Sequence, residues 1–190
     1  MSTMREQIID TTSTLLEAQG YHATGLNQIL TESGAPKGSL YYYFPQGKEE
    51  LTTAAIEQTG KITAERIRAG LATSEDATEA IQSFVHTIAY HVEASDFSAG
   101  GPLMIVAMET VNSSERLNTA CREAYGLLLA AFQEKLMMNG ETEARATQLA
   151  TFIISAIEGA TILSRVHHSG QPLRQVAEEL GLFLKSVCKN

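Results

Sequence analysis

Hydrophobic residues recur every three or four positions along most of this chain, the spacing that places them on one face of an α-helix. The first such stretch runs from Ile8 to Leu16 and loses its pattern at Gly20. Thr3 and Glu6, just before it, have the spacing of a capping box. The pattern predicts an amphipathic helix that begins after Thr3 and ends near Gly20.

Two short helical stretches follow, separated by a glycine. Apolar residues between Leu26 and Leu30 predict a second helix that closes at Gly34, since glycine readily adopts the left-handed conformation of a tight turn. Pro36 suits the first turn of a third helix because its missing N–H is not needed there.

Longer helical stretches fill the rest of the chain, with Thr73 or Ser74 as the expected cap of the fifth helix. The expected ranges are 48–71, a helix around 81–92, 103–110, 115–138, 142–166 and a last helix from residue 173. With about nine helices and no convincing strand, the pattern predicts an all-α fold.

Composition limits where a nucleic acid could bind. The formal net charge is −8, which repels phosphates, so DNA binding would need a local patch. From Gly34 to Lys48 the charged residues are Lys37 and Lys48, with no acid between them. Cys121 and Cys188 are too few for a disulfide framework and are expected to be reduced. We expect a cytoplasmic protein that makes no use of a membrane, because no uninterrupted apolar run approaches about 20 residues.

The segment from Thr24 to Leu51 carries the clearest functional signal: two short helices around a glycine turn. A helix-turn-helix uses this arrangement to lay the start of its second helix in the major groove. Lys37, Gly38 and Ser39 would lead that helix. Tyr41, Tyr42 and Tyr43 would supply hydroxyls and rings at the groove wall, and Leu40 and Phe44 are expected to face inward.

This segment resembles the DNA-binding head of the TetR family (TetR/AcrR-like), with its K-G-S-L-Y-Y-Y-F run followed by a lysine-led fourth helix. Pro36 departs from the family pattern, and Pro45-Gln46-Gly47 makes the following loop slightly longer. The resemblance covers about residues 3 to 51. It implies DNA contacts from the recognition helix, the supporting helix and a phosphate anchor: Lys37, Ser39, Tyr41 and Tyr42; Thr24 with Asn27 or Gln28; and Lys48. Because no arginine occurs between Arg5 and Arg66, Lys37 is the expected reader of guanine, and specificity is expected to depend on Lys37, on Asn27 or Gln28, and on DNA shape.

The resemblance divides the chain into a DNA-binding domain, residues 1–47, and an effector-binding and dimerisation domain, residues 48–190. The fold expected is a three-helix helix-turn-helix head with a helical-bundle body of about six helices. Adaptable apolar residues and one carboxylate within an apolar stretch are candidates for an effector pocket: Phe84, Ile88, Met104, Met108, Tyr125, Phe132 and Glu158. Ordinary core packing, and a solvated or dimer-facing Glu158, are the alternatives.

The function that follows is a sequence-specific transcriptional repressor, not an enzyme, that leaves a palindromic operator when a small lipophilic molecule binds its body. A homodimer through the last two long helices would present two heads to double-stranded DNA. We expect no cofactor and no metal site, since His86 and His91, and His167 and His168, are wrongly spaced to share a ligand face. Control by a protein partner, or an unrecognised helical enzyme, are the rival hypotheses.

Overall fold

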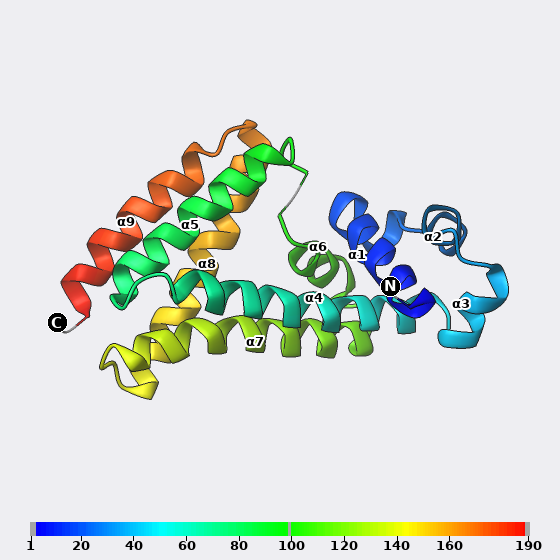
Figure 1. Ribbon diagram of the computed structural model, residues 1–190, viewed down its shortest axis with the longest axis horizontal. Helices are drawn as coiled ribbons and strands as arrows, with labels where there is room; N and C mark the ends of the chain where they lie inside the picture. Colours follow the sequence, from blue (N-terminus) through cyan, green and yellow to red (C-terminus); the bar gives the residue numbers. More distant parts are fainter. Residues whose placement is uncertain (1–2, 99, 189–190) are drawn as a thin grey trace. The chain divides into compact units, whose positions relative to one another are not determined.

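The fold is all-α, as the sequence predicts. The computed structural model describes residues 3–98 and 100–188, and that part of the chain contains helices and loops but no strand. Its helices, labelled in Figure 1, are α1 (Met4–Ala23), α2 (Leu26–Ser33), α3 (Lys37–Tyr43), α4 (Lys48–Leu71), α5 (Ala77–Ala94), α6 (Pro102–Thr110), α7 (Glu115–Met138), α8 (Glu143–His167) and α9 (Gln171–Val187).

The first helix starts and breaks where the sequence indicates. Thr3 and Glu6 form the expected capping box, in which each side chain accepts the other residue's backbone N–H. The helical conformation is interrupted at Gly20, where φ is 80° and ψ is 180°. The helix resumes for one further turn to Ala23, so the predicted end is an internal break.

Two predicted helix starts need correction. Pro36 precedes α3 as its N-cap residue and is not in its first turn. Asp76, and not Thr73 or Ser74, caps α5, because its carboxylate accepts the Glu79 N–H at 2.8 Å. A carboxylate in this place also interacts favourably with the helix dipole.

The helices form two compact units, and the division falls within α4 and within α7. The first unit contains the described residues up to Lys61 together with Gly101–Tyr125. In it, α1 packs against α2, α3 and α6. Its core includes the fully buried side chains of Ile8, Ile29 and Leu40, and each such side chain contributes roughly 1.5–3 kcal/mol when it is removed from water.

The second unit contains Ile62–Gly100 and the described residues from Gly126 onward. In it, α5, α8 and α9 lie side by side (Figure 1). Ile81, Ile153 and Leu184 are fully buried in this bundle. The predicted domain boundary after residue 47 stays a prediction.

Candidate nucleic-acid interface

A left-handed glycine joins α2 to α3. Gly34 has φ 64° and ψ 13°, the conformation that lets the chain reverse immediately after Ser33. The Ser33 hydroxyl accepts the Ala35 N–H at 3.3 Å, and Ala35 itself is buried. This hydrogen bond and the buried Ala35 side chain stabilise the turn, which fixes the angle between α2 and α3.

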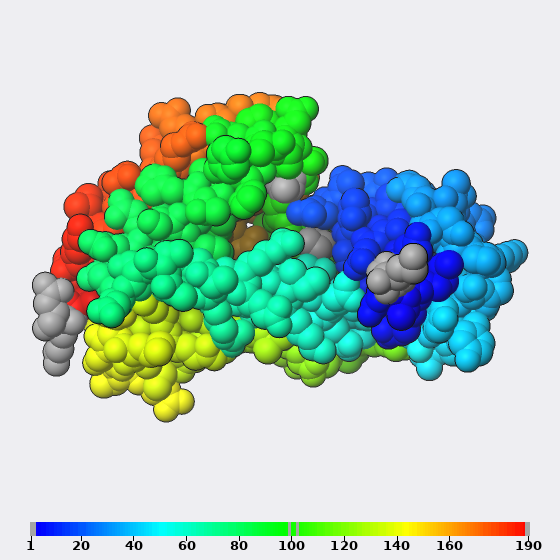
Figure 2. Space-filling view, in the orientation of Figure 1, coloured from blue at the N-terminus to red at the C-terminus, as the bar shows by residue number. Residues whose placement is uncertain are grey.

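Helix α3 has one buried face and one exposed face. Leu40 is buried at 0% exposure, as is the C-cap residue Phe44 at 1%, which confirms the predicted inward pair. Lys37, Gly38, Tyr41 and Tyr42 are exposed, Tyr42 at 80%, and Ser39 is half-buried. These side chains belong to the light blue part of the surface in Figure 2. An exposed cation and two phenols on one short helix are suited to a DNA groove.

The two polar candidates on α2 differ in exposure and in the hydrogen bonds of their side chains. Asn27 is exposed. Gln28 is half-buried, and its amide oxygen accepts the Gln19 Nε2–H at 2.8 Å while its own nitrogen donates to Glu32 at 2.9 Å. Of the two, Asn27 therefore has the side chain that can reach a base or phosphate without breaking these bonds.

Thr24 has a structural role in this geometry. Its side chain is 1% exposed, and its hydroxyl donates to the Gly20 carbonyl at 2.6 Å, at the break in α1. A direct DNA contact by Thr24 would require this buried hydroxyl to leave its acceptor. The hydrogen bond helps fix how α1 leads into α2, and the predicted DNA contact of Thr24 stays a prediction.

The Lys48 ammonium group at the start of α4 donates to the Tyr21 carbonyl at 2.5 Å and lies 4.2 Å from the centre of the Tyr21 ring. Burial lowers the pKa of Lys48, and the negative charge of Glu109 opposes that shift. Burial, with a smaller contribution from Glu49, raises the pKa of Tyr21. Lys48 thus ties α4 to the end of α1, and an ammonium group has further donors for a phosphate.

The carboxylate of Glu109, in α6, accepts the N–H groups of Tyr21 and His22 at 2.6 and 3.0 Å. Sequence reasoning missed this contact. Two features of the sequence could have pointed to it: Glu109 is the one carboxylate in the apolar sequence of α6, and Gly20 interrupts a helical stretch. The break in α1 exposes backbone donors, and Glu109 satisfies them.

The structure brings together part of the predicted effector set. The rings of Phe84 and Phe132 meet edge to face with centroids 6.0 Å apart, and Ile88 lies one turn from Phe84 on α5. Phe132 is buried. Half-buried Glu158 belongs to the same second unit.

The other three members of that set lie in the first unit. Met104 and Tyr125 are half-buried there, and Met108 is 76% exposed. The prediction that all seven line one pocket stays a prediction.

A glycine-turned helix pair with an exposed, basic and tyrosine-rich second helix defines the class: a helix-turn-helix DNA-binding protein. Residues 8–55 match the family "Bacterial regulatory proteins, tetR family". Residues 77–179 match "Transcriptional regulator LmrA/YxaF-like, C-terminal domain". The chain belongs to the TetR family of transcriptional regulators, in its LmrA/YxaF-like group.

Two relatives from Bacillus subtilis (strain 168) match over almost their whole length. The chain is 45% identical over 181 residues to the HTH-type transcriptional regulator YxaF, covering 95% of each chain. It is 37% identical over 181 residues to the HTH-type transcriptional regulator LmrA, covering 95% of this chain and 96% of the relative. The family consists of DNA-binding regulators and not of enzymes.

Solved structures share the fold at low sequence identity. The regulatory protein TetR from Rhodobacter sphaeroides superposes with a TM-score of 0.83 at 18% identity, covering 95% of this chain and 98% of that one. A TetR transcriptional regulator from Legionella pneumophila gives 0.80 at 24%, covering 96% and 98%. These likenesses support the arrangement of helices described above.

Proposed function

We propose that this regulator is a cytoplasmic homodimeric repressor that leaves a palindromic operator when a small lipophilic molecule binds its body. The observation that carries the proposal is the exposed face of α3, where Lys37 stands beside Tyr41 and Tyr42 above a buried Leu40. That face provides one DNA-reading surface per chain. Reading two half-sites requires two such surfaces, and therefore two chains. We assign dimerisation and effector release to the other helices.

The face of α8 that points to solvent supports a dimer. Its residues recur at alternating spacings of four and three, and Phe152, Leu163 and Val166 are 48%, 51% and 70% exposed. Ala156 and Gly159 stand between them, and a Cβ added at Gly159 would meet nothing within 4 Å. Large apolar residues flanking a small centre suit close packing against a second helix.

Helix α9 extends this apolar face. The rings of Phe152 and Phe183 lie 5.0 Å apart, and Leu182 is 64% exposed. A shallow groove runs between the two helices, lined by Phe152, Ala156, Val176, Glu179, Leu180 and Phe183. By length and composition helix α8 is apolar enough to cross a membrane, yet only 33% of its most apolar 18-residue stretch is buried within the chain. A second copy of α8 and α9 would cover this surface.

Effector release needs a path from the body to the head, and we place it along α4. The Phe84 ring packs so closely on α4 that a Cβ added at Gly70 would lie 2.5 Å from its Cδ2. At its other end, α4 holds the Tyr21 carbonyl through Lys48. A molecule that displaces Phe84 would push on one end of a continuous helix whose other end touches the head. Such a ligand must bind the displaced state more tightly in order to lower operator affinity.

The DNA-reading part is tested by selecting genomic fragments with the purified protein and titrating the recovered operator. Lys37→Ala is expected to lose roughly 1–3 kcal/mol of operator binding and to relax base selectivity, as a base contact would. Lys61→Ala is the matched control, because Lys61 is an exposed lysine on α4 away from α3. Full affinity and selectivity in Lys37→Ala would contradict its role as a reader.

The dimer is tested by sedimentation. The wild type is expected at twice the 20.6 kDa chain mass, and Leu163→Glu at the mass of one chain with much weaker operator binding. Met138→Glu places the same charge on an 85% exposed apolar residue of α7 and should remain a dimer. A Leu163→Glu protein that is still dimeric would place the interface elsewhere.

The release step is tested with a panel of lipophilic compounds. Those that raise the thermal unfolding temperature of the protein are binders, and the proposal expects them to weaken operator binding. Binders that leave operator affinity unchanged would contradict release and favour control by a protein partner.

A further inference from the structure

Two arginines outside the helix-turn-helix lie beside the segment Phe44–Gln46, which follows the recognition helix. Neither α2 nor α3 carries an arginine, although arginine is the residue best suited to binding phosphate. Arg116 comes from the first turn of α7, and Arg5 comes from the first turn of α1. Both side chains are exposed, and both belong to the first unit.

The Arg116 guanidinium group is positioned by a neutral partner. Its Nη1 donates to the side-chain carbonyl of Gln46, which is itself exposed. No carboxylate of the described residues lies within ion-pair distance of Arg116. Its charge is therefore oriented but not neutralised, which is the state that favours an external anion.

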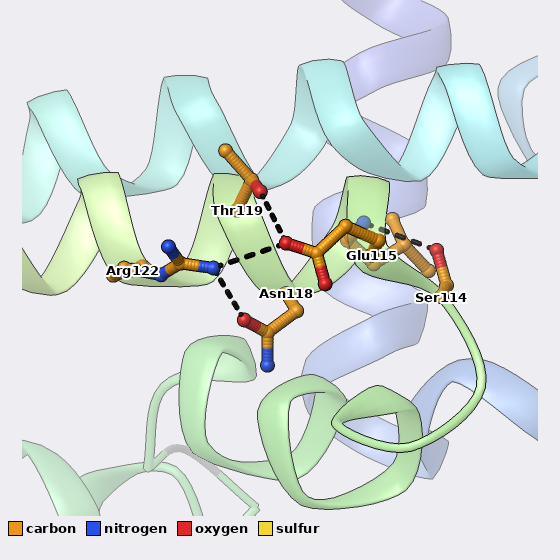
Figure 3. A network of polar contacts seen from close by, with 6 residues as sticks. Ser114, Glu115, Asn118, Thr119 and Arg122 are labelled. Carbon is orange, nitrogen blue, oxygen red and sulfur yellow. Dashed lines mark hydrogen bonds and ion pairs between the residues drawn. The ribbon is translucent and has the colours of Figure 1, made fainter.

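The carboxylates near Arg116 have other donors. Glu49 accepts the hydroxyl of Ser114, and Glu50 accepts the backbone N–H of Gln46 at 2.9 Å. Glu115, adjacent in sequence, accepts from Arg122 at 3.3 Å, and Figure 3 shows this pair on α7. All three carboxylates are held by these hydrogen bonds, and none of them lies within ion-pair distance of Arg116.

The Arg5 guanidinium lies over Phe44, with Cζ 5.4 Å from the ring centre. Phe44 is the C-cap residue of α3, so this contact places a positive charge at the end of the recognition helix. A cation in the first turn of a helix is disfavoured by the helix dipole. A phosphate bound to Arg5 would offset the unfavourable interaction between its charge and the dipole of α1.

A duplex read by α3 brings its phosphates close to these groups. A helix of seven residues is about 10 Å long, similar to the roughly 12 Å width of the major groove. With the outward side chains of α3 in the groove, the end of the helix and the loop after it must lie near a phosphate strand. Phe44 and Gln46 occupy that place, and they hold Arg5 and Arg116.

We propose that Arg116 and Arg5 bind DNA phosphates next to the loop between α3 and α4. With Lys48, they supply the sequence-independent part of the affinity that a protein of net charge −8 otherwise lacks. This inference rests on the DNA-binding and dimeric parts of the proposed function and is independent of effector release.

The test measures affinity against salt for a random-sequence duplex and for the operator recovered by fragment selection. Arg116→Gln is the main variant, because it removes the charge and keeps a polar side chain with hydrogen-bond donors; Arg5→Gln is the second. In a dimer, each substitution removes two contacts and should lower the slope of log K against log salt by about 2. The affinity should fall about 30-fold near 0.15 M salt, equally for both duplexes.

Matched variants make the outcome decisive. Arg122→Gln removes a cation from the same helix that already has Glu115 as partner, and its slope should equal that of the wild type. Arg116→Lys should retain most of the slope because it keeps the charge. An unchanged slope in Arg116→Gln, or an equal loss in Arg122→Gln, would overturn the proposal. If operator binding by the wild type were the same with and without a bound effector, only the proposed release would be contradicted.

Discussion

Gly20→Ala offers the sharpest test of the contact between α1 and α6. Gly20 has φ 80° and ψ 180°, a region that only glycine adopts readily, so alanine would cost about 1–3 kcal/mol in backbone strain. Its Cβ would also lie 2.5 Å from Oε1 and 3.0 Å from Cδ of Glu109, too close for either to stay. The carboxylate would have to move away from the Tyr21 and His22 N–H groups.

The loss of hydrogen bonds to a charged group adds about 1.5–3 kcal/mol, so the expected total for Gly20→Ala is about 2.5–6 kcal/mol. The quantity to measure is the free energy of unfolding from urea titrations followed by circular dichroism, at one protein concentration. Gly34→Ala is the first control: φ there is also positive, but nothing lies within 4 Å, so it should cost only about 1–2 kcal/mol. Gly126→Ala, in a helix with open space, should stabilise by about 0.5–1 kcal/mol.

A double variant separates strain from the clash. In Gly20→Ala with Glu109→Ala, the carboxylate is already gone, so the combined cost should be clearly less than the sum of the single costs. If Gly20→Ala is no more costly than Gly34→Ala, or if the two changes add fully, the reasoning about Glu109 is wrong.

Two further predictions concern titrating groups. The hydrogen bond from Arg174, with a smaller effect from a backbone N–H, lowers the pKa of Glu93. The stabilisation is therefore present above the unfolded pKa of about 4.3 and is lost as pH falls through the folded value. The stability difference between wild type and Glu93→Gln should shrink on acidification, and a difference that does not change with pH would contradict this. Burial raises the pKa of the Cys121 thiol to about 11. Iodoacetamide at about pH 8 should modify half-buried Cys188 first, as peptide masses over time will show, and equal rates would contradict the burial argument.

The sequence was sufficient for features that neighbouring residues determine. Gly34 signalled the turn because few residues other than glycine adopt its conformation easily, and Leu40 with Phe44, four residues apart, predicted the buried face of α3. The bounds of α4 and α7 followed from apolar periodicity and agree with the structure. Asp76 was missed as a cap because several polar residues capable of capping stand together between Thr73 and Asp76.

Contacts between distant residues gave no comparable signal. Tyr21 is 27 positions from Lys48 and 88 from Glu109, and helical periodicity reports only on neighbours within a turn or two. The effector candidates were chosen as large adaptable side chains. That criterion describes their volume and not their position, so it could not separate buried Phe132 from exposed Met108.

The break at Gly20 is costly by itself, and the way its cost is offset links the head to two other helices. The interruption leaves backbone groups near Tyr21 without a regular helical environment; Glu109 of α6 accepts two N–H groups, and Lys48 of α4 donates to a carbonyl. Thr24 closes the same break from within α1 and leads directly into α2. In the proposed mechanism, an effector that shifts α4 must therefore either carry the end of α1 with it or break a charge-assisted bond worth about 1.5–3 kcal/mol. Carrying the end of α1 along also moves the helix-turn-helix that follows it, so that response is the one that changes DNA binding.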